Sequence, residues 1–327
     1  RLAAKLVEEV VEISKVEPPP RSIAVLVNRV ATARKVEDLL TKHFTHEQIT
    51  LLIGRMRPID RDDITDVLRT ELKTRHPNSA PVTQTSAPPR IVVATQCLEV
   101  GADFDFDALV TECASLDALR QRFGRLNRGG RPITARAAIV IRADQVFPET
   151  PDLDANPKAN DPIYGTALTR TWNWLSSIAR DGTVDFGLKA MDEHLAELQK
   201  NDTAGEAFGR LLSPTLDAPM LLPAYLDVWA QTNPEPEPQP EPALFIHGPG
   251  RNAVDIQICW RADLPAPEQN ATLRDWIDTI SLCPPTSVEC LTVSLPEFTR
   301  WFFGGTASDN GDILGVAEAD MPDPKTG

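Results

Sequence analysis

The segment Ile91-Val92-Val93-Ala94-Thr95-Gln96 decides the fold class of this chain. Its continuous apolar run, closed by polar residues, predicts a strand that is buried on both faces of a sheet. Similar apolar runs lie at 23–28, 49–53, 108–111 and 137–141. Stretches with helical periodicity separate them, at about 30–43, 60–72 and 115–128. This alternation predicts an α/β fold with a parallel sheet and flanking helices, in which ligands bind beyond the carboxyl ends of the strands.

A second stretch, Gln121-Arg122-Phe123-Gly124-Arg125-Leu126-Asn127-Arg128-Gly129-Gly130-Arg131, has an unusual charge. The chain has a formal net charge of -14, yet residues 118–143 contain seven arginines and no Asp or Glu. Guanidinium groups pair well with anions, and phosphate is the most plausible one here. The alternative is an ordinary solvated, arginine-rich helix face.

A helix over 115–128 would separate two sides of this stretch. One stripe, which would dock on a core, contains the apolar side chains Leu116, Leu119, Phe123 and Leu126. The opposite side would carry Gln121, Arg125 and Arg128, with Arg122 at its edge. Gly129-Gly130 would end the helix.

The length of 327 residues allows two or three domains. The domain boundaries are indicated by three features: an amphipathic pattern, clustered prolines and a Pro/Glu-rich run. We expect an entry helix and linker at 1–22, the sheet domain at 23–147, a helical extension at 148–232, a linker at 233–242 and an accessory domain at 243–327. Strands predicted at 243–246 and 254–260 and a helix at 275–280 make the accessory domain a small mixed α+β domain.

The five cysteines contain no C-x-x-C pair and predict reduced thiols in a cytoplasmic protein. Cys283 and Cys290 have the spacing of half a metal site, and His43 and His46 lie one helical turn apart, but we expect no metal at either pair. No apolar run is long enough to span a bilayer. Net acidity argues against general coating of nucleic acid, so any such contact must be local. Because the chain starts at Arg1 rather than Met, we expect a piece of a longer protein or a processed one.

Four segments resemble, in order, motifs of superfamily 2 helicases. Residues 25–28 with the following helix resemble motif IV, 52–55 the segment after it, 91–103 motif V and 121–128 motif VI. The likeness covers roughly 23–145 and implies the second RecA-like domain of that superfamily. The Ala-Thr-Gln opening of motif V, the run at 101–107 and the form Gln-Arg-x-Gly-Arg-Leu-x-Arg are similar to the CRISPR-associated helicases of type I interference systems.

The resemblance implies that ATP binds between this domain and a first RecA-like domain, which would hold most of the Mg²⁺. Arg125 and Arg128 would reach the β- and γ-phosphates as catalytic arginines supplied in trans, and Gln121 would sense the γ-phosphate or the domain interface. Gly101, Asp103 and Arg122 are expected on the same cofactor-binding side. Asp103 would either form a hydrogen bond with the ribose or link motif V to motif VI; the alternative is a loop carboxylate that only caps a turn. Arg122 would have a structural or coupling role.

The resemblance also implies contacts to the phosphates of a single strand. The expected nucleic-acid-binding residues are Thr95, Asn28, Arg29, Gly54 and Arg55. The plain alternative for Thr95 is the N-cap of a helix. If the protein contacts only the sugar-phosphate backbone of the strand, its binding of nucleic acid should tolerate different base sequences and weaken as the salt concentration rises.

Several helicase parts are missing from this sequence. It has no G-x-x-x-x-G-K-[ST], no D-E-x-H or D-E-A-D box, and no His-Asp dipeptide of an HD nuclease. The main hypothesis is therefore the C-terminal half of an ATP-dependent helicase, inactive alone, that acts on single-stranded DNA. Its expected partners are the first RecA-like domain and a CRISPR surveillance complex, with no membrane. The alternatives are half of an RNA helicase, or a degenerate helicase-like module that only binds or scaffolds.

Overall fold

The structure is a computed structural model that describes residues 1–73, 88–98, 103–150, 152–201, 206–214, 219–231, 242–247, 255–264 and 272–304. It forms two compact units. The first contains Arg1–Ser213 and Gln257–Val293, and the second contains Pro214–Ile256 and Ser294–Gly327. Most of the predicted loop at 76–89 and of the predicted linker at 233–242 lies outside the described residues.

The centre of the first unit is a parallel sheet. Its strands are β1 (Ser22–Leu26), β2 (Ile49–Leu52), β3 (Arg90–Ala94), β4 (Ala108–Glu112) and β5 (Arg136–Val140), in the order β2-β3-β1-β4-β5. Leu26 is in register with Ala94 on one side and with Thr111 on the other. The residues that follow these strands therefore meet at one edge of the sheet. The predicted α/β fold with a RecA-like parallel sheet is confirmed.

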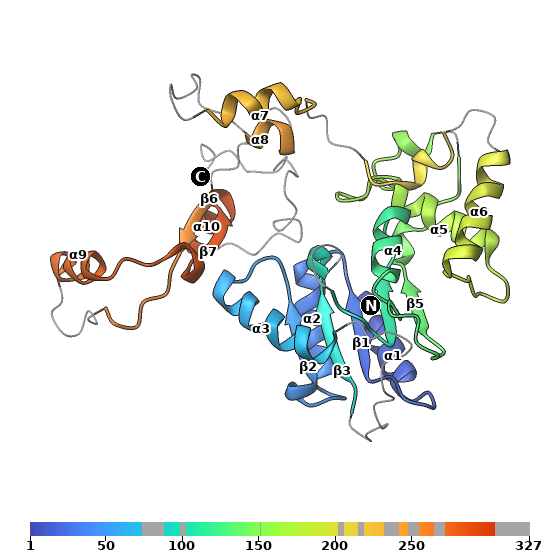
Figure 1. The fold of residues 1–327 in the computed structure, drawn as a ribbon, viewed down its shortest axis with the longest axis horizontal. Helices are drawn as coiled ribbons and strands as arrows, with labels where there is room; N and C mark the ends of the chain where they lie inside the picture. Colours follow the sequence, from blue (N-terminus) through green and yellow to red (C-terminus); the bar gives the residue numbers. More distant parts are fainter. Residues whose placement is uncertain are drawn as a thin grey trace. The chain divides into compact units, whose positions relative to one another are not determined.

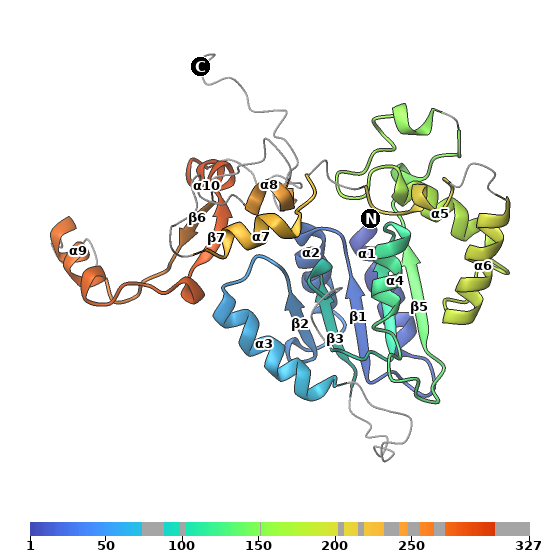
Figure 2. The ribbon, with the colours of Figure 1, turned by 45° about the horizontal axis from the view of Figure 1, so that its top comes forward.

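Helices cover both faces of this sheet (Figures 1 and 2). Along β1, Ile23 and Val25 pack into one core with α1 (Leu2–Ser14) and α2 (Val30–Leu40). Ala24 and Leu26 face the opposite core, which includes Leu68 of α3 (Pro58–Glu71). This alternation follows from the period of two in a strand. The helix α1, expected as an entry helix before the domain, thus packs on the sheet itself.

The helix α4 (Leu116–Phe123) is shorter than the predicted helix over 115–128. It stops at Gly124 because the next residues pair with a neighbouring extended segment. The Phe106 N–H donates to the Arg125 carbonyl at 2.9 Å, and the Asn127 N–H donates to the Phe106 carbonyl at 2.8 Å. The prediction that Gly129-Gly130 ends the helix is therefore wrong, and Arg125 and Arg128 do not lie on a regular helix face.

The region after the sheet is helical, as predicted. It contains α5 (Ala167–Ile178) and α6 (Leu188–Asn201). The short 3-10 helices among the described residues are η1 (His46–Gln48), η2 (Gln96–Leu98), η3 (Ala143–Gln145), η4 (Leu153–Ala155), η5 (Gly209–Leu211) and η7 (Ser287–Glu289). Leu116 and Leu119 of α4 pack in cores that contain residues of this region.

The remaining elements are short. β6 (Asp255–Ile258) pairs with β7 (Leu291–Ser294), and α9 (Leu273–Leu282) lies between them in the chain. The other helices are α7 (Pro223–Trp229), α8 (Pro242–His247) and α10 (Leu295–Phe302). The predicted strand at 243–246 is wrong, because these residues belong to α8. A short apolar run does not distinguish strand from helix, and Phe245 packs its ring 5.4 Å from that of Trp229 on α7. Within the described residues, no helix has the length and apolar character needed to cross a membrane.

Candidate functional site

The carboxyl edge of the sheet gathers residues from motif IV, from the segment after it and from motif V. Asn28 follows β1, Thr95 follows β3 and Glu112 ends β4, while Gly54 and Arg55 follow β2. Gly101 lies outside the described residues. Thr95 is only 6% exposed, and its hydroxyl lies 3.9 Å from the Cys97 sulfur. The Thr95 carbonyl accepts the Leu98 N–H at 3.4 Å, at the start of η2.

The segment after motif V alternates between aromatic and acidic side chains. Phe104 and Phe106 are fully buried in the core beneath α3. The intervening carboxylates turn towards the arginine stretch, where Asp103 Oδ1 lies 3.4 Å from Arg128 Nε and Asp105 Oδ1 lies 3.0 Å from Arg131 Nη2. Protein carboxylates, rather than an external anion, thus balance part of the positive charge of the arginines. The ion pair with Arg128 also connects Asp103 of motif V to motif VI.

Arg125 and Arg128 lie close enough to influence each other. Burial lowers the pKa of the Arg125 guanidinium, and the positive charge of Arg128 lowers it further. The negative charge of Asp103 acts in the opposite direction and raises this pKa. The side chain of Arg128 is 43% exposed, and Gln121 on α4 is also exposed. Two cations held near one another create a local positive potential that an anion would relieve. Whether this anion is the phosphate of a nucleotide stays a prediction.

Arg122 has a different place from the other motif VI arginines. It is fully buried, and its guanidinium donates hydrogen bonds of 2.9 to 3.0 Å to four protein oxygens. These oxygens belong to the Thr111 hydroxyl, the Glu112 carbonyl, the Asn28 side chain and the Tyr164 hydroxyl. The guanidinium of Arg122 is thus enclosed by protein groups, and its expected place on the cofactor-binding side stays a prediction.

Asn28 and Arg29 also turn inward. Asn28 is 4% exposed, and its side-chain amide donates to the Cys113 carbonyl at 2.8 Å. Arg29 Nη2 lies 3.8 Å from Asp161 Oδ2, with only 13% of its side chain exposed. The structure thus does not place the Asn28 side chain where a phosphate could reach it, and it pairs Arg29 with a buried carboxylate.

Glu112 is the acidic member of this interior cluster. Its Oε2 accepts the Asn28 backbone N–H at 2.8 Å. Burial raises the pKa of the Glu112 carboxyl, against the opposing effects of this hydrogen bond and of the Arg122 charge. A buried carboxylate beside a buried guanidinium is stable only while both keep their partners.

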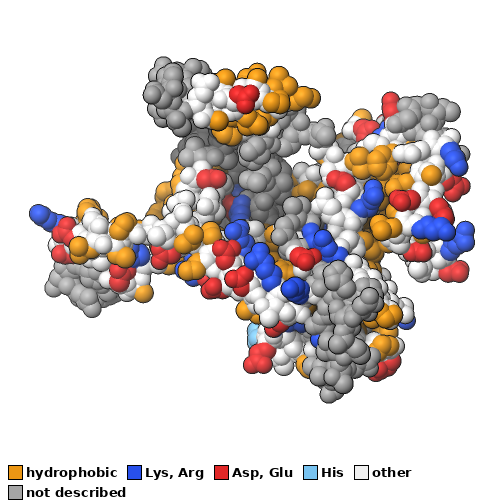
Figure 3. All heavy atoms as spheres, in the orientation of Figure 1, with side chains coloured by type: hydrophobic (Ala, Val, Ile, Leu, Met, Phe, Trp, Pro, Cys, Tyr) orange, Lys and Arg blue, Asp and Glu red, His pale blue; other side chains and the backbone are white. Residues whose placement is uncertain are grey.

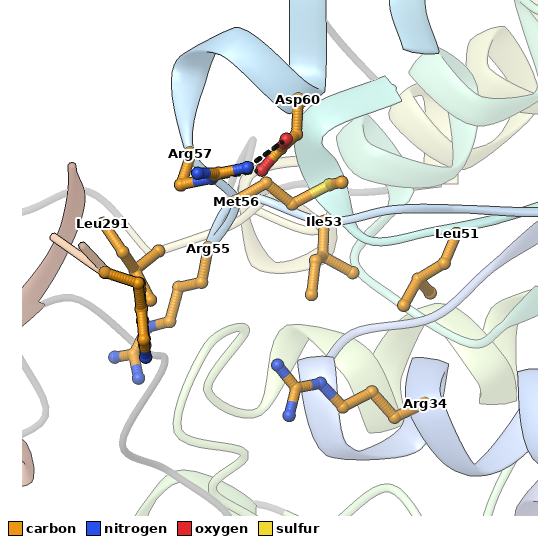
Figure 4. Close-up of a pocket in the computed structure, with 9 residues that line it drawn as sticks. Arg34, Leu51, Ile53, Arg55, Met56, Arg57, Asp60 and Leu291 are labelled. Carbon is orange, nitrogen blue, oxygen red and sulfur yellow. Dashed lines mark hydrogen bonds and ion pairs between the residues drawn. The ribbon is translucent and has the colours of Figure 1, made fainter. Parts of the chain in front are cut away.

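Arg55 lines a cavity of about 330 Å³ beside β2. Figure 4 shows the side chain of Arg34, from α2, and that of Arg55 extending into this space. Arg57, at the same rim, is held by Asp60 through hydrogen bonds of 2.6 and 2.7 Å. Figure 3 shows Lys and Arg side chains gathered beside α3 on the face that it presents. At Gly54 an added Cβ would meet nothing within 4 Å, so packing within the chain does not require a glycine there.

Two residues of this site were not predicted from the sequence. Arg34 lies in the second turn of α2 and shares the cavity with Arg55. Arg34 could have been predicted from the sequence, because it lies in the helix that follows motif IV at the carboxyl edge of the sheet. Tyr164, which contacts Arg122, lies outside every recognised motif and left no such signal.

All five cysteines are free thiols. Burial raises the pKa of the Cys113 thiol to about 12, so this side chain is a neutral core group. Among the described residues, no group of three or more His, Cys, Asp or Glu side chains has the arrangement of a metal site.

Comparison with known proteins gives one consistent result. Residues 20–131 match the family model described as the C-terminal part of the CRISPR-associated nuclease/helicase Cas3. The CRISPR-associated endonuclease/helicase Cas3 of Thermus thermophilus is 36% identical over 138 residues, which are 40% of this chain and 14% of that protein. The CRISPR-associated helicase Cas3 of Thermoproteus tenax is 37% identical over 84 residues, which are 25% of this chain and 14% of that protein.

The chain thus matches only a small part of the length of these relatives. Among solved structures, that of T. fusca Cas3-AMPPNP aligns with a TM-score of 0.47 and 17% identity, over 91% of this chain and 35% of that one. The order of the motifs, the parallel sheet that carries them and the matching family model all agree. Residues 20–131 form a RecA-like α/β domain and are similar to the C-terminal part of the CRISPR-associated nuclease/helicase Cas3.

Proposed function

We propose that this chain supplies the second half of an ATP-dependent motor that moves on single-stranded DNA in CRISPR interference. The observation that supports it most is the position of Asn28, Gly54 and Thr95 after strands β1, β2 and β3, at the carboxyl edge of a parallel sheet, within the residues that match the helicase family model. In α/β sheets this edge is where ligands bind. The remaining part of the chain would cover the DNA or dock on a CRISPR surveillance complex.

In this proposal Arg125 and Arg128 face ATP held by a first RecA-like domain, and Gln121 senses its γ-phosphate. Bound ATP supplies the phosphoanhydride bond whose hydrolysis drives movement. An arginine supplied in trans stabilises charge that develops in the transition state and contributes roughly 10³–10⁵ in rate. The ion pair between Asp103 and Arg128, at 3.4 Å, would hold Arg128 ready until the phosphates compete for it.

The DNA phosphates would meet Arg55 and Arg34 at the cavity beside β2 and the backbone at Thr95 and Gly54. The open space above Gly54 allows a strand to approach the main chain closely. Asn28 and Arg29 would support this surface from within, because their side chains bond to protein groups. These contacts read the backbone of a strand rather than its bases.

The catalytic assignment is tested in the full-length protein that carries both RecA-like domains. Arg125→Ala and Arg128→Ala should each abolish DNA-stimulated ATP hydrolysis and leave binding of a single-stranded oligonucleotide within about twofold. Arg120→Ala, an exposed arginine of the same helix, is the matched control and should hydrolyse ATP normally. Hydrolysis that survives both substitutions would show that the arginines are wrongly assigned.

Two further measurements separate the alternatives. The 327-residue chain alone should hydrolyse no ATP, since it contains no G-x-x-x-x-G-K-[ST] sequence; turnover above background contradicts the proposal. Binding to matched DNA and RNA strands then tests the nucleic acid. A requirement for the 2′-hydroxyl would favour an RNA helicase, and strand binding without any hydrolysis by the full-length protein would favour a scaffold.

A further inference from the structure

The helical region after β5 contacts α4 from its first turn to its last. This region lies outside residues 20–131, which match the helicase family model. Near the start of α4, the Ser213 N–H donates to Asp117 Oδ1 at 2.9 Å. At its end, the ring of Phe186 stacks on that of Phe123, with centroids 3.8 Å apart and planes at 12°. The helix that carries the start of motif VI is therefore held from outside the sheet.

Tyr164 provides the polar contact of this region to motif VI. Its hydroxyl accepts a hydrogen bond from Arg122 Nη2 at 3.0 Å and lies 3.5 Å from Gln96 Nε2. Arg122 belongs to motif VI and Gln96 to motif V. Gln96 Nε2 also donates to the Asn28 carbonyl at 3.0 Å. One hydroxyl thus joins both motifs to a residue from outside the matched domain.

The position of this hydroxyl is fixed by a tight turn. Asp161 Oδ1 accepts the N–H groups of Ile163 and Tyr164, at 2.9 and 3.1 Å. Gly165, with a φ of 56°, lets the chain turn back so that its N–H donates to the Asp161 carbonyl at 2.8 Å. The Tyr164 ring is 3% exposed and packs in the core that contains Leu119 of α4.

The contact continues towards the proposed catalytic arginines. The Arg122 carbonyl accepts the Arg125 N–H at 3.0 Å, directly after α4 ends. Arg122 therefore holds the turn that carries Arg125 through its backbone, while Tyr164 holds Arg122 through its side chain. A hydrogen bond to a charged donor in a buried site keeps both groups in one geometry.

We propose that the Tyr164 hydroxyl is a positioning group that makes the helical region part of the motor, by fixing Arg122 and through it the orientation of Arg125. This inference rests on the proposed function for its effect on hydrolysis. Tyr164 itself does not touch the nucleotide. Removing the hydroxyl leaves the ring packed but removes one of the four oxygens that accept hydrogen bonds from the Arg122 guanidinium.

The test uses Tyr164→Phe in the full-length protein that carries both RecA-like domains. The matched control is Tyr225→Phe, since Tyr225 is the other tyrosine of this chain and is 45% exposed. Well below the melting temperature, Tyr164→Phe should lower kcat for DNA-stimulated ATP hydrolysis about tenfold, with KM for ATP and DNA affinity within about twofold. A merely structural role would lower the melting temperature without lowering kcat of the folded enzyme.

A second readout does not depend on hydrolysis. In the 327-residue chain, NMR signals of the arginine Nε–H groups of Arg122 and Arg125 should shift in Tyr164→Phe and stay unchanged in Tyr225→Phe. An unchanged Arg125 signal, or an unchanged kcat in an active enzyme, overturns the inference. If the wild-type protein hydrolyses no ATP, the proposed function fails, and the NMR shifts alone decide whether Tyr164 positions Arg125.

Discussion

Asn28 Oδ1 accepts a hydrogen bond of 2.9 Å from Arg122 Nη2, although 94 positions separate the two residues in the chain. Both side chains are buried. The bond ties the end of β1 to the last turn of α4, and Glu112, which receives the Asn28 backbone N–H, adds a negative charge beside it. Motifs IV and VI are therefore connected through the interior of the domain, beneath the surface on which a ligand would bind.

Replacing Arg122 should destabilise the domain strongly. Arg122→Met keeps much of the side-chain length but leaves four acceptor oxygens, the Glu112 backbone carbonyl among them, without this donor. Breaking a buried charged pair costs about 3–5 kcal/mol, and we expect a loss of that size in the free energy of unfolding, measured by urea titration of the 327-residue chain. The control is Arg120→Met at an exposed position of the same helix, which should change stability by less than about 0.5 kcal/mol. Equal effects of the two variants would contradict the buried network.

The raised pKa of Glu112 predicts a pH dependence of stability. Because burial raises its pKa above the ordinary value of 4.5 in the folded protein, the protonated form is favoured by folding. Its contribution is fully present below pH 4.5 and is lost as the pH rises through the folded pKa. Glu112→Gln keeps an acceptor oxygen without a charge, so its stability relative to the wild type should increase from about pH 4.5 upward.

Urea titrations of both proteins from pH 4 to pH 8 measure this difference for Glu112. The control Glu193→Gln changes an exposed carboxylate on α6 and should give a curve parallel to that of the wild type. A wild-type advantage that grows with pH would mean that the charge pair with Arg122 outweighs burial.

The ion pair between Asp103 and Arg128 should contribute little to stability. The two side chains are 65% and 43% exposed, and exposed pairs typically contribute 0–1 kcal/mol. A double-mutant cycle with Asp103→Ala and Arg128→Ala should therefore give a coupling energy below about 1 kcal/mol in thermal or urea unfolding. A larger coupling would show that the pair is a structural clamp and not a contact available for exchange with phosphate.

Arg131 should behave in the opposite way. It bonds to Asp105, whose side chain is 2% exposed, and to Asp107, whose side chain is 12% exposed. Arg131→Met leaves these carboxylates without a counter-charge and should lower the free energy of unfolding by about 3 kcal/mol. Arg136→Met at an exposed position of β5 is the control. A loss below about 1 kcal/mol would indicate that water replaces the guanidinium easily.

The cavity beside β2 makes a prediction about salt. Arg55→Ala in the full-length protein should weaken binding of single-stranded DNA and reduce the slope of log affinity against log salt by about 0.7, as expected when one phosphate contact is lost. Arg57→Ala is the matched control, because Asp60 already holds the Arg57 guanidinium, and the slope should change less. Equal slopes for the wild type and Arg55→Ala would remove Arg55 from the proposed DNA surface.

The sequence by itself determined the parallel sheet and the carboxyl edge at which Asn28, Gly54 and Thr95 lie. Continuous apolar runs such as Ile91–Ala94 predict strands buried on both faces, and the order of strands and helices restricts how they connect. Local pattern is sufficient for these features because each depends on neighbours in the chain.

Only the tertiary structure decided which polar residues face inward and where α4 ends. The sequence predicts a structural or coupling role for Arg122 but not its partners, and the structure encloses its guanidinium with Asn28 and Tyr164, 94 and 42 positions away. The helix ends at Phe123 because backbone groups of Phe106 compete for Arg125 and Asn127. Helical periodicity continued past this point, but hydrogen bonds between distant segments decided the outcome, and no local pattern records them.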